Sequence, residues 1–232
     1  MKSYPKVVVV MPAYNAAKTL KRTYIAIPKK IVSEVILVDD SSHDETVKIA
    51  NSLSIKTFVH KYNKGYGGNQ KTCYRKALEL GADIVVMIHP DYQYDPRRLP
   101  QLIKPIIEGR FDIMLGSRIR TRNEALSGGM PRYKYYGNRF LTLIQNIILG
   151  QNLSEYHTGF RAFSKEALKK LPINKFSNDF VFDQQILICA IRKNLKIGEV
   201  HVDAKYKKDS SSINFIKSLK YGMQTLLELV NN

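Results

Sequence analysis

The sequence has no tryptophan, only two cysteines and no long hydrophobic run. Cys73 and Cys189 are too few for a disulfide scaffold, and neither stands in a CxxC or Cys/His pattern typical of zinc sites. We therefore expect the protein to reside in a reducing compartment. The most apolar stretch, residues 140–149, is far shorter than the roughly 18–20 residues that cross a bilayer. No segment is therefore predicted to span a membrane.

Acidic residues are scarce: 20 Asp and Glu stand against 37 Lys and Arg, and the net charge is +17. Such a charge favours a polyanionic partner, which could be a nucleic acid, an anionic membrane surface or a phosphate-rich substrate. The chain has no zinc-finger, helix-turn-helix or RNP-like pattern, so we expect no nucleic-acid partner.

The usual glycine-rich phosphate motifs are also missing. There is no GxGxxG after the first apolar run and no GxxxxGK[ST], which removes most of the support for a dinucleotide-binding or P-loop protein. Glycine and proline are modest, at 13 and 9 of 232 residues, and 44% of residues are hydrophobic. This composition excludes collagen-like, low-complexity and disordered chains.

Short apolar runs alternate with helical patterns through the first half. Strands are predicted at 7–11, 35–38, 57–59, 84–88 and 113–115, and helices at 17–27, 44–53, 69–80 and 99–108. Continuous Val/Ile/Leu runs are typical of parallel strands covered on both faces, so we predict a mostly parallel, doubly wound α/β sheet. Ligands bind at the carboxyl ends of such strands, where Asp39, Asp40, Asp91 and Arg118 should converge.

In the second half of the chain, the alternation of strand and helix patterns is less regular. We predict a mobile basic loop at about 119–134, amphipathic segments at about 135–149 and 213–230, a helix at 183–194 and a strand at 197–202. No repeat or linker interrupts the chain, so residues 1–232 are predicted to form a single domain.

Two segments at predicted strand ends suit a nucleotide ligand. Asp39-Asp40-Ser41-Ser42 offers carboxylates to ribose or base groups, although the same residues also make an ordinary turn and helix cap. The loop 63–69 has small residues that permit close approach of a phosphate or nucleoside, and its alternative is a flexible turn.

The segment 89–96 points to a metal. His89, Asp91 and Gln93 alternate after an apolar strand, which places oxygen and nitrogen donors on one side. Such a set suits a divalent ion that completes its shell with a substrate diphosphate and water.

Five segments together resemble the family 2 inverting glycosyltransferases of the GT-A fold. They are residues 10–15, 38–46, 63–69, 91–96 and 116–118, in matching order and spacing. Within that family, Thr158-Gly159-Phe160-Arg161 and the basic loop are similar to the polyprenyl-phosphate monosaccharide synthases, the dolichyl-phosphate mannose synthase group.

The resemblance implies roles for individual residues. The implied substrate-binding residues are Pro12, Ala13, Tyr14, Asn15, Asp39, Asp40, Asn63, Gly67, Asn69, Ser117 and Arg161. The implied metal ligands for Mg²⁺ or Mn²⁺ are Asp91 and Gln93, with His89 as a third candidate. Asp91, Arg118, Arg132 and Asp183 are the implied catalytic residues, and both arginines are expected to face an acceptor phosphate.

The chain departs from the family pattern at two places. His89 replaces the first carboxylate of the Asp-x-Asp metal motif, and it is either a direct ligand favouring manganese or a group behind the ligands. Asp183 is the only acid near the position where relatives that glycosylate hydroxyls supply a base. It is either that base or a helix N-terminal charge. A lipid phosphate needs no base, because it is already an oxyanion at neutral pH.

The segments 140–149 and 213–230 are either buried core or in-plane membrane helices beside basic residues. We therefore expect a cytoplasmic protein, peripheral at the cytoplasmic face of the membrane, or the cytoplasmic portion of a longer membrane protein.

The predicted function is transfer of one sugar from a UDP- or GDP-linked hexose to a polyprenyl (dolichyl or undecaprenyl) phosphate, with inversion. Two alternatives are a sugar or protein hydroxyl acceptor and a catalytically silent nucleotide-sugar-binding domain.

Overall fold

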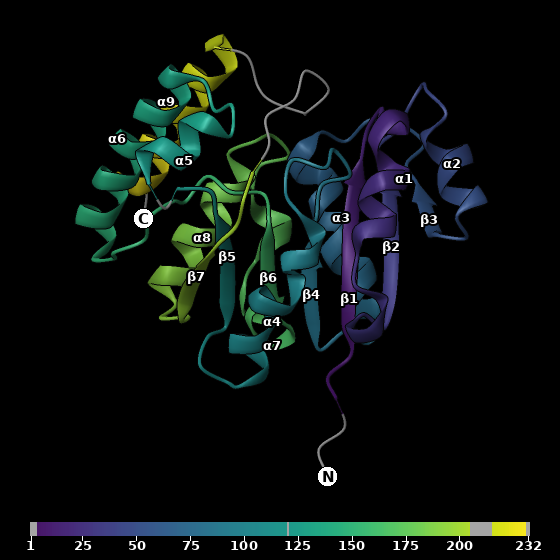
Figure 1. The fold of residues 1–232 in the computed structure, drawn as a ribbon. Coiled ribbons are helices and arrows are strands. Elements are labelled where there is room, and N and C mark those ends of the chain that lie inside the picture. The colour runs from purple at the N-terminus through teal and green to yellow at the C-terminus, as the bar shows by residue number, and fades with distance from the viewer. Residues whose placement is uncertain (1–3, 120, 205–214, 231–232) are drawn as a thin grey trace.

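A seven-stranded sheet forms the centre of the molecule (Figure 1). The computed structural model describes residues 4–119, 121–204 and 215–230. The strands are β1 (Val7–Ala13), β2 (Glu34–Asp39), β3 (Lys56–Val59), β4 (Ile84–Met87), β5 (Ile113–Ser117), β6 (Arg161–Ser164) and β7 (Ile197–His201). The α-helices are α1 (Ala17–Ala26), α2 (Thr46–Ser52), α3 (Tyr66–Glu79), α4 (Leu99–Ile107), α5 (Arg122–Ser127), α6 (Arg132–Leu149), α7 (Lys165–Lys170), α8 (Phe182–Arg192) and α9 (Phe215–Val230). Short 3₁₀ turns span Lys29–Ile31, Pro96–Arg98 and Ile173–Lys175.

The strand order is β3-β2-β1-β4-β6-β5-β7. All neighbours run parallel except at β6, which is antiparallel to both β4 and β5. Because β6 runs the opposite way, its first residue, Arg161, lies at the edge where the parallel strands end. The predicted mostly parallel sheet is confirmed.

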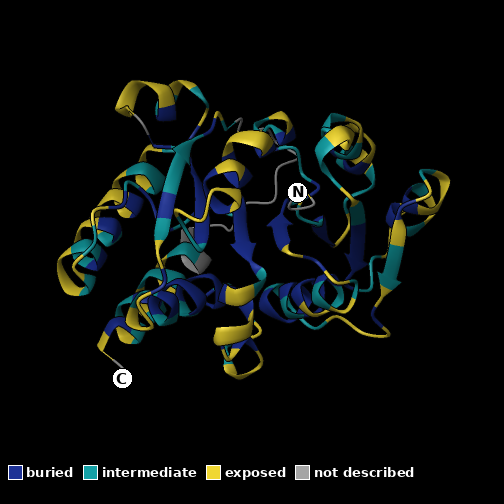
Figure 2. Cartoon of the chain, turned by 90° about the horizontal axis from the view of Figure 1, so that it is seen from below, coloured by how far each residue is buried: buried dark blue, intermediate teal, exposed yellow. Residues whose placement is uncertain are grey.

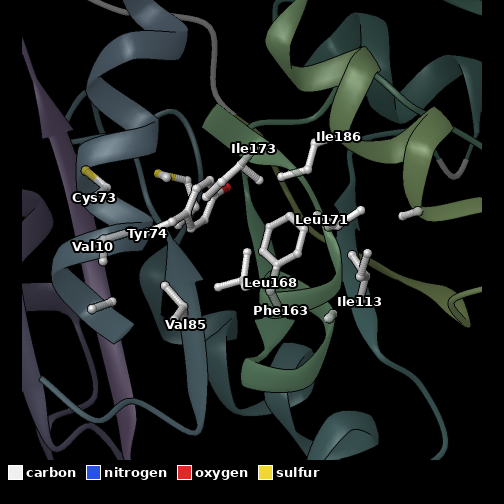
Figure 3. Packing of buried hydrophobic residues seen from close by; sticks show 14 of the residues in the cluster. Val10, Cys73, Tyr74, Val85, Ile113, Phe163, Leu168, Leu171, Ile173 and Ile186 are labelled. Atoms are coloured by element: carbon white, nitrogen blue, oxygen red, sulfur yellow. The ribbon is translucent and has the colours of Figure 1, made fainter. Parts of the chain in front are cut away.

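Helices cover both faces of the sheet, as predicted. Along β1, Val8 and Val10 join the core beneath α3, α7 and α8, whereas Val7 and Val9 join the core beneath α1, α2 and α4. This alternation follows from the two-residue period of a strand. In Figure 2 the inner strands are buried, whereas the edge strands β3 and β7 are mostly intermediate or exposed and the outer faces of the helices are exposed. Figure 3 shows the first core, where Tyr74 of α3 faces Phe163 of β6.

Three differences from the predicted elements matter for the site. The helix predicted from residue 69 begins earlier, at Tyr66, so Gly67 lies in its first turn. Strand β6 was not predicted. The predicted mobile basic loop contains α5, whose N-terminus is capped by Thr121 Oγ1 accepting from the Glu124 amide at 3.2 Å. The predicted loop is therefore helical over 122–127, and residue 120 of the prediction lies outside the described residues.

Helices α6 and α9 lie side by side next to the β5–β7 end of the sheet (Figure 1). Their contact includes Leu141, which packs against Gly222. No helix in the described ranges has both the length and the apolar character needed to cross a bilayer.

Candidate functional site

The carboxyl edge of the sheet carries backbone strain. Asn15, Ser41 and Tyr92, which follow the ends of β1, β2 and β4, have φ values of 51°, 63° and 54°. Non-glycine residues rarely adopt this left-handed conformation, and such residues cluster at functional sites. Ser54 and Asn194, which precede β3 and β7, have the same conformation at the opposite edge, so it is the sheet topology that indicates where a ligand binds.

Asp40 anchors the loop between β3 and α3. Its Oδ1 is 2.7 Å from Nδ1 of His60 and accepts from the Lys64 amide at 2.9 Å, and its Oδ2 accepts from the Gly65 amide at 3.0 Å. Asn63 Nδ2 donates to the Asp40 carbonyl at 3.1 Å. Asp40 thus holds the loop that was predicted to approach a nucleotide, and its carboxylate is engaged within the protein.

The other residues of the predicted nucleotide set lie around this loop. Asp39 accepts from the amide and hydroxyl of Ser42 at 2.8 and 2.5 Å, and Asn15 Oδ1 accepts from the His43 amide at 2.9 Å. Asn69 donates to the Ala13 carbonyl at 3.3 Å, while its Oδ1 is buried without a hydrogen-bond partner. Pro12 is buried in β1, and the Tyr14 side chain is exposed. The structure therefore brings this set together at the ends of β1 and β2.

A cavity of about 230 Å³ opens between the end of β4 and helix α6. Five residues predicted from the sequence line it: His89, Asp91, Gln93, Arg118 and Asp183. It is also lined by residues that the sequence reasoning did not select, among them Tyr66, Tyr94, Lys134, Asn138, His157 and Tyr221.

Asp91 and Gln93 form a tight turn on the cavity wall. Asp91 Oδ1 accepts from the Gln93 amide at 3.0 Å, which supports the left-handed Tyr92 between them. Within the described residues no group of three His, Cys, Asp or Glu side chains could hold a metal ion. His89, Asp91 and Gln93 nevertheless suit an ion such as Mg²⁺ or Mn²⁺, which takes one or two protein ligands and completes its shell with phosphates and water.

Tyr66 connects His89 to Asp183. Its hydroxyl donates to Asp183 Oδ2 at 2.7 Å and lies 3.2 Å from His89 Nε2, and its ring stacks on the imidazole. Burial, together with the charge of Asp183, raises the pKa of Tyr66 well above its ordinary value. Burial also lowers the pKa of His89. Both groups are therefore neutral near pH 7.

Asp183 is held from three sides. Arg161 Nη1 lies 3.4 Å from its Oδ1, Gln70 Nε2 donates to the same oxygen at 3.1 Å, and Tyr66 donates to the other oxygen. Both oxygens of the Asp183 carboxylate are therefore engaged within the protein. The residue also lies in the first turn of α8, where a negative charge favours the helix.

Arg161 is fully buried and does not line the cavity. Its guanidinium donates to the carbonyls of Thr158, Asp183 and Tyr156 at 2.7, 2.9 and 3.1 Å. The predicted contact with substrate therefore has no support in its position, which is behind Asp183.

Arg118 reaches the cavity from the end of β5 and is paired with Glu155. The Arg118 amide and Nε donate to the Glu155 carboxylate at 2.8 and 2.9 Å, and Asn138 of α6 donates to it at 2.8 Å. Although burial alone would raise the pKa of Glu155, the charge of Arg118 and these bonds keep it below its ordinary value. The charge of Arg118 is thus largely balanced.

Lys134, and not Arg132, is the basic residue of α6 that lines the cavity. Arg132 is exposed at the start of the helix. Among the described residues no ion pair involves Lys134, and burial together with the charge of Arg118 lowers its pKa. The structure thus replaces the expected arginine pair with Arg118 and Lys134.

Gly67 and Ser117 support the site from behind. A Cβ at Gly67 would lie 2.5 Å from the Ser177 carbonyl oxygen, so this glycine permits α3 to pack against the segment before α8. Ser117 Oγ is 2.7 Å from Ser154 Oγ. Neither residue lines the cavity.

The fold and the site define a class of protein. A family model described as glycosyl transferase family 2 matches residues 8–172, and the chain belongs to this family. It is therefore a glycosyltransferase, and the family resemblance expected from the sequence is confirmed.

The chain is similar to individual members over most of its length. It is 33% identical to UDP-N-acetylglucosamine–dolichyl-phosphate N-acetylglucosaminyltransferase of Methanococcus voltae, over 87% of this chain and 86% of the relative. It is 26% identical to undecaprenyl-phosphate mannosyltransferase of Micrococcus luteus, over 85% and 82%.

The fold is similar to glucosyl-3-phosphoglycerate synthase of Mycobacterium tuberculosis. The TM-score is 0.77 at 21% identity, covering 99% of this chain and 80% of that chain. Another structure of that enzyme, with Mn²⁺, UDP-glucose and phosphoglyceric acid, gives a TM-score of 0.76. The expected GT-A-like fold is confirmed.

Proposed function

We propose that this protein transfers one sugar from a nucleotide-sugar to a polyprenyl phosphate, with inversion at the anomeric carbon. The observation that carries the proposal is the cavity wall: it offers the cation Lys134, while its deep carboxylate Asp183 is already engaged by Arg161. The names of the Methanococcus and Micrococcus relatives, which give dolichyl and undecaprenyl phosphate, support the same acceptor class.

The contacts of the Asp183 carboxylate favour a phosphate acceptor over a hydroxyl acceptor. A hydroxyl must lose a proton during attack, which requires a base, and both oxygens of Asp183 are already engaged by Arg161, Gln70 and Tyr66. A phosphate monoester is already an oxyanion at neutral pH. In a single displacement its oxygen forms the bond to the anomeric carbon as the bond to the diphosphate breaks, and a nucleoside diphosphate leaves.

The donor is proposed to lie along the ends of β1 and β2. The loop anchored by Asp40, with Asn15 and Asn69, would hold a UDP or GDP moiety, and the diphosphate would extend toward Asp91. The buried Oδ1 of Asn69 lacks a partner and is suited to a donor group of the base or ribose. Thermal shifts with UDP and GDP test this placement, since a ligand that binds only the folded state raises Tm.

His89, Asp91 and Gln93 are proposed to hold Mg²⁺ or Mn²⁺ against the diphosphate. When bound, such an ion stabilises the charge that develops on the leaving group. Asp91 supplies the negative charge of this set, and His89 shifts its preference toward manganese.

The acceptor assignment is tested by competition. With radiolabelled nucleotide-sugar, a short-chain polyprenyl phosphate should take up the label, while the matched polyprenol and free sugars should not. Label on a hydroxyl acceptor and none on the phosphate would contradict the proposal and favour hydroxyl glycosylation. Nucleotide binding without any transfer would indicate a catalytically silent domain.

Lys134 should bind the acceptor phosphate. Lys134→Met is expected to raise KM for the polyprenyl phosphate by about 10–100-fold, because a hydrogen bond to a charged group contributes roughly 1.5–3 kcal/mol. Arg132→Met is the matched control, since it removes a cation two residues away that lies outside the cavity lining. Equal losses in the two variants would contradict the role of Lys134.

The protein is proposed to act at the cytoplasmic face of a membrane. Exposed apolar stripes run along α6 (Phe140, Leu143 and Ile147) and α9 (Leu219, Met223 and Leu227). Amphipathic helices of this kind lie in the interface, and the net charge of +17 favours anionic lipids. Basic residues of the predicted loop, such as Arg122 of α5 and Arg132 of α6, would then lie near the head groups.

Vesicle sedimentation tests this association. Leu143→Gln/Ile147→Gln should weaken binding to anionic vesicles by about tenfold or more, because each buried Leu or Ile contributes roughly 1.5–3 kcal/mol. Ile25→Gln, an equally polar change on an exposed isoleucine of α1, is the control. Unchanged binding in the double variant would exclude this face of α6 as the membrane contact.

A further inference from the structure

We propose that Asp183 and Tyr66 fix the tautomer of His89, so that the Nδ1 lone pair of the imidazole faces the cavity as a ligand for the divalent ion. The inference rests on the metal dependence in the proposed function. It decides between the two roles that the sequence leaves open for His89.

The Tyr66 hydroxyl has a single proton to donate. Asp183 can only accept, because its carboxylate is paired with Arg161 and also accepts from Gln70 Nε2 at 3.1 Å. The short contact of 2.7 Å between Tyr66 and Asp183 Oδ2 therefore holds the phenolic proton.

The direction of the Tyr66 hydrogen bond determines which nitrogen of His89 is protonated. Since the Tyr66 proton is committed to Asp183, the phenolic oxygen can only accept at its 3.2 Å contact with His89 Nε2. His89 must donate there, so a neutral ring carries its proton on Nε2 and a lone pair on Nδ1. No hydrogen bond in the described part of the chain involves Nδ1.

Tyr66 and Gly159 limit the orientation of the His89 ring. The imidazole is stacked on Tyr66 with a centroid distance of 5.4 Å and an interplanar angle of 9°. Gly159 also lies against it, because a Cβ on this glycine would be 2.8 Å from His89 Cδ2 and 3.0 Å from Nε2. A ring flip would break the bond to Tyr66, so the stacking and the hydrogen bond favour one orientation.

Asp183 and Tyr66 are then positioning residues. Histidines that bind metals usually donate their other nitrogen to a carboxylate or carbonyl, which sets the tautomer and increases ligand basicity. Here a tyrosine stands between the carboxylate and the imidazole. Asp183 then acts on His89 through Tyr66, and this positioning role does not require it to be a base.

Two spectroscopic measurements test the inference without turnover. In the metal-free protein, ¹⁵N–¹H correlation of the histidine rings should show His89 protonated at Nε2, with His89→Gln providing the assignment. With Mn²⁺ and either UDP or GDP, electron spin-echo modulation from a directly bound ¹⁴N should appear in the wild type and disappear in His89→Gln.

Tyr66→Phe should remove the preference for the Nε2 proton and weaken Mn²⁺ binding by about 10–100-fold. Tyr74→Phe is the matched control, because it removes a phenol from the same helix that bonds to Gln70 and not to His89. It should leave the His89 spectrum and the Mn²⁺ affinity within about twofold of the wild type.

An Nδ1-protonated ring in the wild type, or a Mn²⁺ complex without nitrogen modulation, would overturn the inference. If turnover still requires Mn²⁺ in that case, the proposed function stands and only the role of His89 fails. Full transfer in excess chelator would instead contradict the metal dependence, and the inference with it.

Discussion

Asp91→Asn is expected to lower turnover by about 10²–10³-fold, the usual cost of removing one electrostatic contact to the transition state. The substitution removes the negative charge proposed to hold the ion. The asparagine oxygen can still accept from the Gln93 amide, so the turn around Tyr92 should persist. Tm is therefore expected to stay within about 2 °C of the wild type. Initial rates with Mn²⁺ and a thermal melt check both expectations.

Asp95→Asn is the matched control for this experiment. Asp95 lies in the same segment and accepts from the Arg97 amide at 3.0 Å, yet it does not line the cavity. The turnover rate of Asp95→Asn should remain within about threefold of the wild-type rate, as is usual for a surface substitution. Full activity of the wild type in excess chelator, or equal losses in both variants, would contradict the assignment of Asp91.

Arg161→Lys is expected to lower the free energy of unfolding by about 2–6 kcal/mol, because two buried carbonyls lose their donor and each such loss costs roughly 1–3 kcal/mol. A lysine cannot reproduce the planar fork that reaches the carbonyls of Thr158 and Tyr156 while facing Asp183. The corresponding decrease in Tm is about 4–24 °C for a chain of this size. Denaturant titration measures the free energy directly.

Arg75→Lys provides the reference for that measurement. Arg75 forms an exposed pair with Glu79 on α3, so its replacement should change stability by less than about 0.5 kcal/mol. If Arg161→Lys kept its stability and lost affinity for the nucleotide, Arg161 would belong to the substrate site, as the sequence suggested.

The parallel strands could be predicted because they are apolar throughout. Val7–Val10 and Ile84–Met87 have both faces covered, so their sequences are continuous hydrophobic runs. Strand β6 is not a continuous apolar run, because it begins with Arg161. The charge of Arg161 is balanced by Asp183, which lies 22 residues further along the chain. The predicted family and fold, by contrast, followed from motifs spread over most of the chain.

Part of the site could be predicted in the same way. His89, Asp91 and Gln93 follow directly from the end of an apolar strand, and the structure places all three on one cavity. Their chemical roles remain predictions. The choice between Arg132 and Lys134 depends on the phase of α6, which the sequence does not define. Two residues along an α-helix differ by about 200°, so these side chains point to nearly opposite sides.

Tyr66 was missed for a different reason. Its importance comes from contacts with His89 and Asp183, which lie 23 and 117 residues away in the sequence. For Asp40 the sequence indicated a carboxylate available for a ligand. In the structure this carboxylate instead accepts from the amides of Lys64 and Gly65. Such pairings arise only from tertiary structure.

The antiparallel strand β6 also has a consequence for the order of assembly during synthesis. Strands β1 to β4 are neighbours built from residues 7–87, so their pairing can form as soon as this part of the chain is made. Strand β5 has no place beside them, because β6 separates it from β4. Until residue 164 leaves the ribosome, β4 therefore presents an unpaired edge, which is a site where chains associate wrongly.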